Sequence, residues 1–114
     1  MNIAGIHLTL IGVADMLLEP GHSLDISARD DLIVSIIGRL QEVKAERLYY
    51  DLVEVPVIDP FYYSWLDALA RACRSINVRM ICIHMQPTAA FALAHQLKDM
   101  PIFETAHDVM GQKG

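Results

Sequence analysis

The sequence predicts a single α/β domain spanning residues 1–114, with a mixed, mostly parallel sheet of about four to five strands and about three to four helices. Hydrophobic residues make up 54% of the chain, enough for one well-covered core. Helical and strand patterns alternate over residues 27–110, which is typical of βα units. Residues 2–19 alternate apolar and polar side chains around Gly12, which predicts an antiparallel hairpin at the front of the sheet.

A turn and an amphipathic helix are predicted after this hairpin. Residues 19–22 read Glu-Pro-Gly-His, a composition typical of turns. Ser27 is a candidate cap for a helix of about five turns. Its apolar side chains recur at spacings of three and four and should face the sheet: Leu32, Ile33, Ile36, Ile37, Leu40 and Val43.

Two further strand–helix pairs follow. Residues 48–53 and 78–85 are apolar runs that predict buried strands. The first leads into a helix that starts after Pro60 and ends near Asn77. We expect its inner side to carry Tyr62, Trp65, Leu66, Leu69 and Cys73.

The C-terminal part is predicted to hold one more helix and a short edge strand. Gln86-Pro87 should open a helix that runs to about residue 98. Residues 102–104 are expected to form the edge strand, and residues 106–110 at most a stub of helix. The expected core side of the helix carries Ala90, Phe91, Ala94 and Leu97.

The most informative stretch is residues 51–61, Asp-Leu-Val-Glu-Val-Pro-Val-Ile-Asp-Pro-Phe. A buried strand ends there in a short loop that leads to a helix N-terminus. Asp59 can cap that helix, and Pro60 suits its first position, where a missing N–H costs nothing. Free amides and positive dipole at such a terminus suit an anion or a docking partner.

This stretch resembles the central loop of the STAS domain family, the anti-sigma-factor antagonists and stressosome scaffold proteins, whose run reads roughly Asp-Ile-Thr-Gly-Val-Pro-Val-Val-Asp-Thr/Ser. A second run, residues 78–90, is similar to the family's strand, Gln-Pro turn and following helix. Together the resemblance covers about residues 26–106. The ungapped matches in the loop are Asp51, Leu52, Val55, Pro56, Val57, Ile58 and Asp59.

The resemblance implies a STAS-like fold, but the positions that the family phosphorylates differ. In the family, kinases modify the Ser or Thr after the loop aspartate, and in the scaffold branch also the Thr two residues after the strand aspartate. Here these positions hold Pro60 and Val53, and neither side chain has a hydroxyl. We therefore predict a module that is not phosphorylated there; Ser64 and Ser75 are the nearest remaining hydroxyls.

The composition argues against several function classes. The net charge of −5 leaves no basic surface for nucleic acid. No run approaches the ~18 apolar residues of a membrane-spanning helix, and residues 1–7 lack the charged start of a targeting segment. We expect a cytoplasmic protein without nucleic-acid or membrane partners. Cys73 and Cys82 fall inside a helical and a strand pattern, so buried, reduced thiols are expected.

No catalytic, metal or cofactor site is predicted, and we expect that the chain is not an enzyme. Histidine and cysteine spacings do not fit common metal sites, and a site built from Cys82, His84 and His95 is the weaker interpretation. Asp51 and Asp59 should lie at one edge of the sheet, where a carboxylate pair could do acid–base work. The stronger interpretation makes Asp59 a helix cap and Asp51 an acceptor for loop amides.

Aromatic residues crowd this region. Because consecutive side chains cannot all point inward, at least Phe61 or Tyr63 should be exposed beside the loop, either as ordinary packing or as a binding surface. The first hypothesis is a non-enzymatic signalling module with protein partners. The resemblance implies a serine-kinase-like switch protein, an anti-sigma factor or other STAS proteins, and a homo-oligomer is compatible with it. The candidate contact residues are Glu54, Pro56, Val57, Ile58, Asp59, Pro60, Phe61, Tyr63 and Ser64.

The alternative hypothesis is a regulatory domain that binds a small ligand or nucleotide. The helix N-terminus at Asp59-Pro60 faces the Gln86-Pro87 turn, and both follow strand C-terminal ends, where open α/β sheets place their ligands. Against it, Asp59 and Glu54 put negative charge where an anion would sit.

Overall fold

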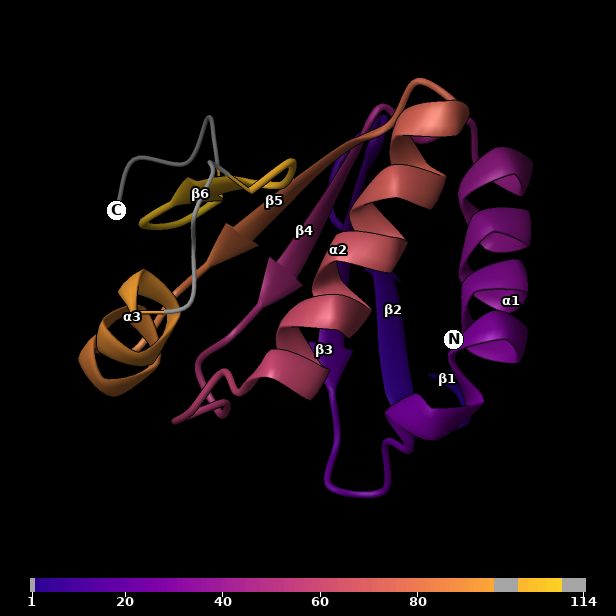
Figure 1. Ribbon diagram of the computed structural model, residues 1–114. Coiled ribbons are helices and arrows are strands. Elements are labelled where there is room, and N and C mark those ends of the chain that lie inside the picture. Colours follow the sequence, from indigo (N-terminus) through magenta and orange to yellow (C-terminus); the bar gives the residue numbers. More distant parts are fainter. Residues whose placement is uncertain (1, 96–100, 110–114) are drawn as a thin grey trace.

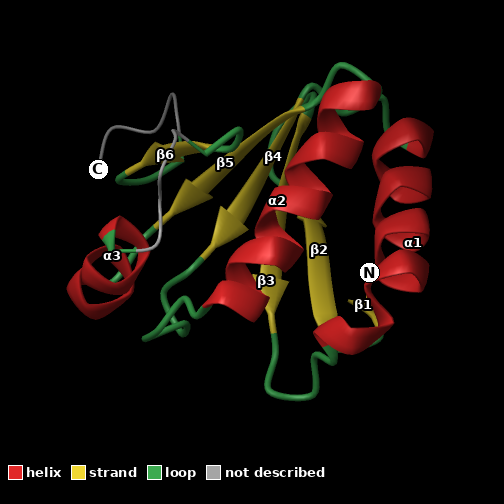
Figure 2. Cartoon of the chain, in the orientation of Figure 1, coloured by secondary structure: helices red, strands yellow, loops and turns green. Residues whose placement is uncertain are grey.

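In a computed structural model, the described part of the chain forms a six-stranded sheet with helices packed on it (Figures 1 and 2). The structure describes residues 2–95 and 101–109. The strands lie in the order in which they occur in the chain: the pairs β1–β2 and β2–β3 are antiparallel, and β3 through β6 are parallel. The elements are β1 (Asn2–Ile3), β2 (Ile6–Leu10), β3 (Asp15–Pro20), the 3-10 turn η1 (Ile26–Ala28), α1 (Arg29–Glu42), β4 (Arg47–Asp51), α2 (Pro60–Ser75), β5 (Arg79–Ile83), α3 (Pro87–Ala94) and β6 (Glu104–Ala106).

This architecture confirms the predicted mixed, mostly parallel α/β sheet. The front hairpin is present as β2 and β3, paired with Leu8 opposite Leu18. The two-residue strand β1 adds to the four to five strands that the patterns predict. Gly5 allows the tight turn from β1 to β2: its φ is +88°, and a Cβ there would lie 2.6 Å from the backbone nitrogen of Leu24.

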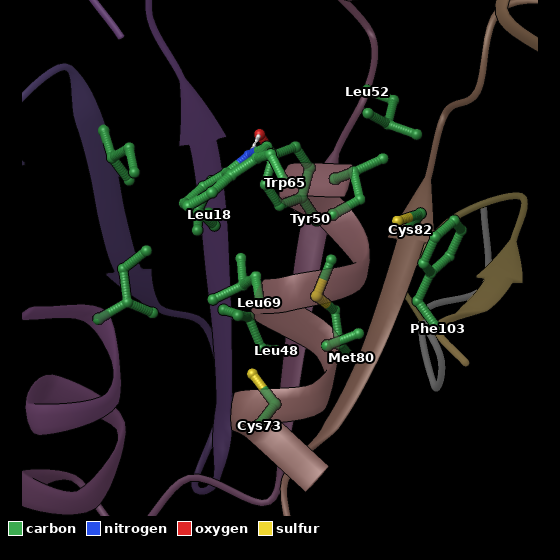
Figure 3. Packing of buried hydrophobic residues seen from close by; sticks show 14 of the residues in the cluster. Leu18, Leu48, Tyr50, Leu52, Trp65, Leu69, Cys73, Met80, Cys82 and Phe103 are labelled. Atoms are coloured by element: carbon green, nitrogen blue, oxygen red, sulfur yellow. Dashed lines mark hydrogen bonds between the residues drawn. The ribbon is translucent and has the colours of Figure 1, made fainter. Parts of the chain in front are cut away.

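Helices α1 and α2 lie side by side across one face of the sheet (Figure 1). Because side chains alternate between the faces of a strand, Leu48 and Tyr50 of β4 and Met80 of β5 point toward α2 (Figure 3). There they pack with Trp65 and Leu69. The intervening residues form a second, smaller buried cluster on the sheet, made of Tyr49, Ile81 and Ile83.

The predicted core side of α2 is confirmed, and so is its end. Trp65, Leu66, Leu69 and Cys73 are buried, and Tyr62 is half-buried. The helix ends at Ser75, and Asn77 adopts a left-handed conformation (φ +61°) of the kind that terminates helices.

The start of α1 differs from the prediction. The Ser27 hydroxyl does not cap the helix; it donates to Asp25 Oδ1, which also accepts from the backbone N–H of Ser27 at 3.0 Å. Asp25 therefore caps the preceding turn η1, and α1 continues from Ala28 without a side-chain cap. The inward residues Leu32, Ile36 and Leu40 are buried, as the periodicity predicts.

The C-terminal region corrects three further expectations. Ala90, Phe91 and Ala94 are exposed, and α3 instead buries Ala89 and Leu93, because the helix extends past the end of the sheet rather than across it (Figure 2). Leu97 lies outside the described residues. The edge strand is Glu104–Ala106 rather than residues 102–104, with Phe103 buried before it. Residues 107–109 are not helical, and residue 110 lies outside the described part.

Both cysteines are buried free thiols, as expected. Burial raises the pKa of Cys73 to about 12 and that of Cys82 still further, so both remain protonated. Among the helices of the described residues, none has the length and apolarity needed to span a bilayer.

Candidate functional site

The loop between β4 and α2, residues 52–59, is anchored in the core at regular intervals. Leu52, Val55 and Ile58 are buried, and the Leu52 N–H donates to the Ile83 carbonyl at 2.9 Å. The Val55 N–H donates back to the Leu52 carbonyl at 3.0 Å and closes a turn. Ile58, a candidate contact residue by sequence, is thus an anchor and presents no side chain to a partner.

Two aspartates organise the ends of this loop in the roles expected of them. Asp51 Oδ1 accepts from the Val53 N–H at 2.9 Å. Asp59 Oδ1 accepts from the Tyr62 N–H at 2.7 Å and caps α2, with Pro60 as the first helical residue. Because the Asp59 carboxylate already occupies this amide, the helix N-terminus disfavours an anionic ligand.

The turn before α3 fastens the same loop from the other side. Gln86 Nε2 donates to the Val53 carbonyl at 2.5 Å, and Thr88 Oγ1 donates to the Pro56 carbonyl at 2.5 Å. These two residues are not among those that the sequence marks as functional. The only sequence signal for them is the Gln-Pro-Thr run in the second family-like stretch.

The loop presents exposed apolar side chains despite this anchoring. The exposed fractions are 53% for Val53, 56% for Val57 and 59% for Phe61. We call the exposed side chains of residues 53–61 the loop surface. It also includes Glu54, Pro56, Asp59 and Pro60.

Tyr63 and Ser64 lie one turn into α2. Tyr63 is half-buried and packs edge-on against Phe103, with ring centroids 6.0 Å apart. Ser64 is exposed, and its hydroxyl accepts from Arg29 Nη1 at 2.8 Å, while the Ser64 carbonyl accepts from the same nitrogen at 3.3 Å. The aromatic exposure predicted beside the loop therefore falls on Phe61.

His84 links the loop to the C-terminal segment. Its Nδ1 lies 3.0 Å from Asp51 Oδ1, and its Nε2 lies 3.2 Å from Asp108 Oδ1. The hydrogen bond to Asp51 raises the pKa of His84 above its ordinary value, and the charge of Asp108 acts in the same direction. His84 adopts a left-handed conformation (φ +56°), which turns the chain out of β5.

Cys82, His84 and His95, the residues considered for a metal site, make other contacts. Cys82 is buried in the core near Tyr50, and the His95 ring packs on Phe91 with centroids 4.4 Å apart. Within residues 2–95 and 101–109, no group of three His, Cys, Asp or Glu side chains is arranged to hold a metal ion.

Behind the loop lies a buried chain of polar groups that sequence patterns do not reveal. Trp65 Nε1 donates to the Tyr50 hydroxyl at 2.9 Å (Figure 3), and the Tyr50 and Tyr62 hydroxyls lie 2.6 Å apart. Desolvation raises the pKa of Tyr62 to about 12 and that of Tyr50 well above its usual range, so both phenols are neutral donors.

Comparisons with known proteins identify solved structures that have the same fold. No protein-family model matches the sequence, and no curated protein sequence matches it significantly. Solved structures do match. A variant of RsbS from Moorella thermoacetica is 16% identical, with a TM-score of 0.71 over 91% of this chain and 87% of that chain.

Two further structures agree. The anti-sigma factor antagonist SpoIIAA, in its unphosphorylated form, is 11% identical, with a TM-score of 0.59 over 91% of this chain and 89% of its own. A chain from the stressosome, described as a signal integration and transduction hub, is 15% identical, with a TM-score of 0.62 over 90% of this chain and 89% of its own.

These neighbours are STAS-domain proteins, so the chain has the STAS-domain fold. The resemblance that the loop and the Gln-Pro turn suggest is confirmed at the level of the fold. At 11–16% identity, the likeness establishes the arrangement of the chain and not its partners.

Proposed function

We propose that this chain is a non-enzymatic signalling module that docks a protein partner through the loop surface. The candidate partners are a serine-kinase-like switch protein, an anti-sigma factor, or other STAS proteins, including further copies of this chain. The observation that carries the proposal is the exposure of Val53, Val57 and Phe61 on a loop whose backbone is fixed from both sides.

Fixed apolar side chains favour docking for an energetic reason. Association costs the entropy of any loop that must be ordered, and a preorganised loop avoids much of that cost. An exposed aromatic side chain such as Phe61 can then supply the buried anchor that dominates many interfaces. The names of the structural neighbours, an anti-sigma factor antagonist and a stressosome, support a protein-binding role in signalling.

The residue at the start of α2 separates this chain from a phosphorylated switch. Pro60 has no hydroxyl, and neither has Val53. Phosphate at such a position would add nearly two negative charges next to the docking residues. We propose that the chain stays unphosphorylated and that its docking is therefore constitutive.

Complex formation tests the proposal. Sedimentation and titration calorimetry measure binding to a kinase-like or anti-sigma candidate protein, and sedimentation also measures self-association. We expect Phe61→Ala to weaken the complex tenfold or more, as loss of an interface anchor does. The matched control is Val34→Ala, because Val34 is 72% exposed on α1, outside the loop surface. Equal binding by the Phe61 and Val34 variants would contradict the proposal.

Mass spectrometry tests the prediction that the wild-type chain is not phosphorylated. After incubation with the partner kinase and ATP, we expect no added phosphate on the wild-type chain and one phosphate on a Pro60→Ser variant. Phosphate on wild-type Ser64 would contradict constitutive docking, because Ser64 is exposed and adjoins the loop surface.

A further inference from the structure

A pocket of about 280 Å³ lies beside the loop, between the β3–α1 connection and the β4–α2 connection. Both connections follow C-terminal ends of neighbouring parallel strands and lie at the same end of the sheet (Figure 1). Its apolar lining includes Leu24, Ile26 and Val55, and Tyr62 borders it from α2. The volume is just below the roughly 300–1,000 Å³ typical of pockets for drug-sized ligands, so it suits a small group.

The buried polar chain fixes the direction in which protons are donated. Trp65 Nε1 is only a donor, so the Tyr50 oxygen accepts from it. Tyr50 is fully buried, and among the described residues the Tyr62 oxygen is the acceptor within reach of its proton. Tyr50 therefore donates to Tyr62, because the opposite direction would leave a buried hydroxyl proton unpaired.

It follows that the Tyr62 hydroxyl proton has no acceptor among the described residues. Tyr62 is half-buried and is one of the residues that line the pocket, so a group bound there can be the acceptor. Neutral phenols donate, and burial keeps the pKa of Tyr62 at about 12. A ligand in the pocket therefore binds more tightly if it supplies an oxygen atom that accepts this proton.

The mouth of the pocket selects against negative charge. Glu54 and His22 line it from opposite connections, with Oε2 and Nε2 3.8 Å apart. The Glu54 carboxylate places negative charge at the mouth, which disfavours an anion there.

From these observations we propose that the pocket binds a small, neutral amide with an apolar substituent. Its carbonyl oxygen accepts a hydrogen bond from the Tyr62 hydroxyl, and its substituent packs on Leu24, Ile26 and Val55. Such a group can come from a free amide metabolite or from the backbone of a peptide segment. The pocket adjoins the loop surface, because Glu54, Pro56 and Val57 also line it, but binding of a free amide is measured without a partner protein.

Backbone amide chemical shifts in an NMR titration test the proposal with two matched probes. Butyramide and butyrate have the same shape and differ in charge. We expect butyramide to shift the amides of Leu24, Val55 and Tyr62, and butyrate to leave them unchanged. A third probe, N-acetyl-leucine methylamide, distinguishes the sources. Binding tighter than that of butyramide indicates a peptide segment, and equal or weaker binding indicates a free amide.

A variant pair isolates the hydroxyl. In Tyr62→Phe, butyramide should bind about fivefold more weakly, the factor expected of one neutral hydrogen bond. Tyr63→Phe lies on the same helix but outside the pocket and should bind as the wild type does. If Tyr62→Phe does not fold, the comparison of butyramide with butyrate on the wild-type protein still tests the proposal. The proposal is overturned if neither amide probe shifts the pocket residues, if butyrate binds as well as butyramide, or if Tyr62→Phe binds butyramide unchanged.

Discussion

The Thr88 hydroxyl donates a hydrogen bond to the Pro56 carbonyl, although the two residues are 32 positions apart in the chain. Gln86 makes the same kind of bond to the Val53 carbonyl. The Gln-Pro-Thr turn after β5 thus fixes the backbone of the loop after β4. The backbone of the loop surface is therefore held by hydrogen bonds from a neighbouring βα connection.

Removing the Thr88 hydroxyl should loosen the loop. In Thr88→Val the shape is nearly kept and one hydrogen bond is lost, so we expect a loss of about 1 kcal/mol in the free energy of unfolding. Hydrogen exchange at Val53 and Val55, whose amides donate hydrogen bonds in the loop, should become faster. The control is Thr9→Val on β2, which should leave exchange in the loop unchanged. Unchanged exchange in Thr88→Val would show that the loop is held by its buried residues alone.

The Trp65–Tyr50–Tyr62 chain should behave as one coupled unit. Tyr50→Phe leaves the Trp65 N–H without its acceptor, and Tyr62→Phe leaves the Tyr50 proton without one. We expect each change to cost about 1–3 kcal/mol in urea unfolding. The double variant should cost less than the sum, because Tyr50→Phe also removes the proton that Tyr62→Phe orphans. Additive losses would contradict the coupling.

Stability should depend on pH through His84. Its folded-state pKa is raised by Asp51. A raised pKa means that the charged histidine stabilises the fold. This contribution is fully present below the unfolded value of about 6.5 and is lost as the pH rises through the higher folded pKa.

Thermal unfolding between pH 5.5 and 8.5 measures this effect. The wild type should lose stability toward high pH relative to His84→Asn, which lacks the titrating group. Val34→Ala serves as the control, because Val34 is 72% exposed on α1 and has no titrating group, and it should follow the wild-type profile. Parallel profiles for the wild type and His84→Asn would show that the two carboxylates do not hold the imidazole.

Thiol labelling should report on global unfolding. Both cysteines are buried and their pKa values are raised by burial, so neither supplies a reactive thiolate. We expect an aromatic disulfide reagent to label neither residue at neutral pH until denaturant unfolds the core. Rapid labelling of one cysteine in native buffer would reveal local opening of α2 or β5.

Local patterns predict those parts of the fold that local chemistry dictates. The periodicity of α1 and α2, the Asp59 cap with Pro60, and the left-handed Asn77 all follow from short-range rules. The patterns fail at α3, because its sequence is apolar on all sides and its burial depends on where the sheet ends. Phe91 is therefore exposed where core packing was expected.

In the candidate site, too, some features follow from the local sequence and others arise only in the folded chain. The exposure of Phe61 follows from crowded aromatics in one short segment, and both aspartate roles follow from their positions at element ends. The bonds from Gln86 and Thr88, and the pairing of Tyr50 with Tyr62, join residues that only the folded chain brings together. No spacing rule in one sequence reveals such contacts.

Hydrogen exchange on a complex with a partner protein tests the docking account most directly. The amides of residues 53–63 should become protected on binding, while those of residues 11–14 in the β2–β3 turn should exchange as in the free chain. Protection confined to the β2–β3 turn, with residues 53–63 unchanged, would show that the partner binds elsewhere.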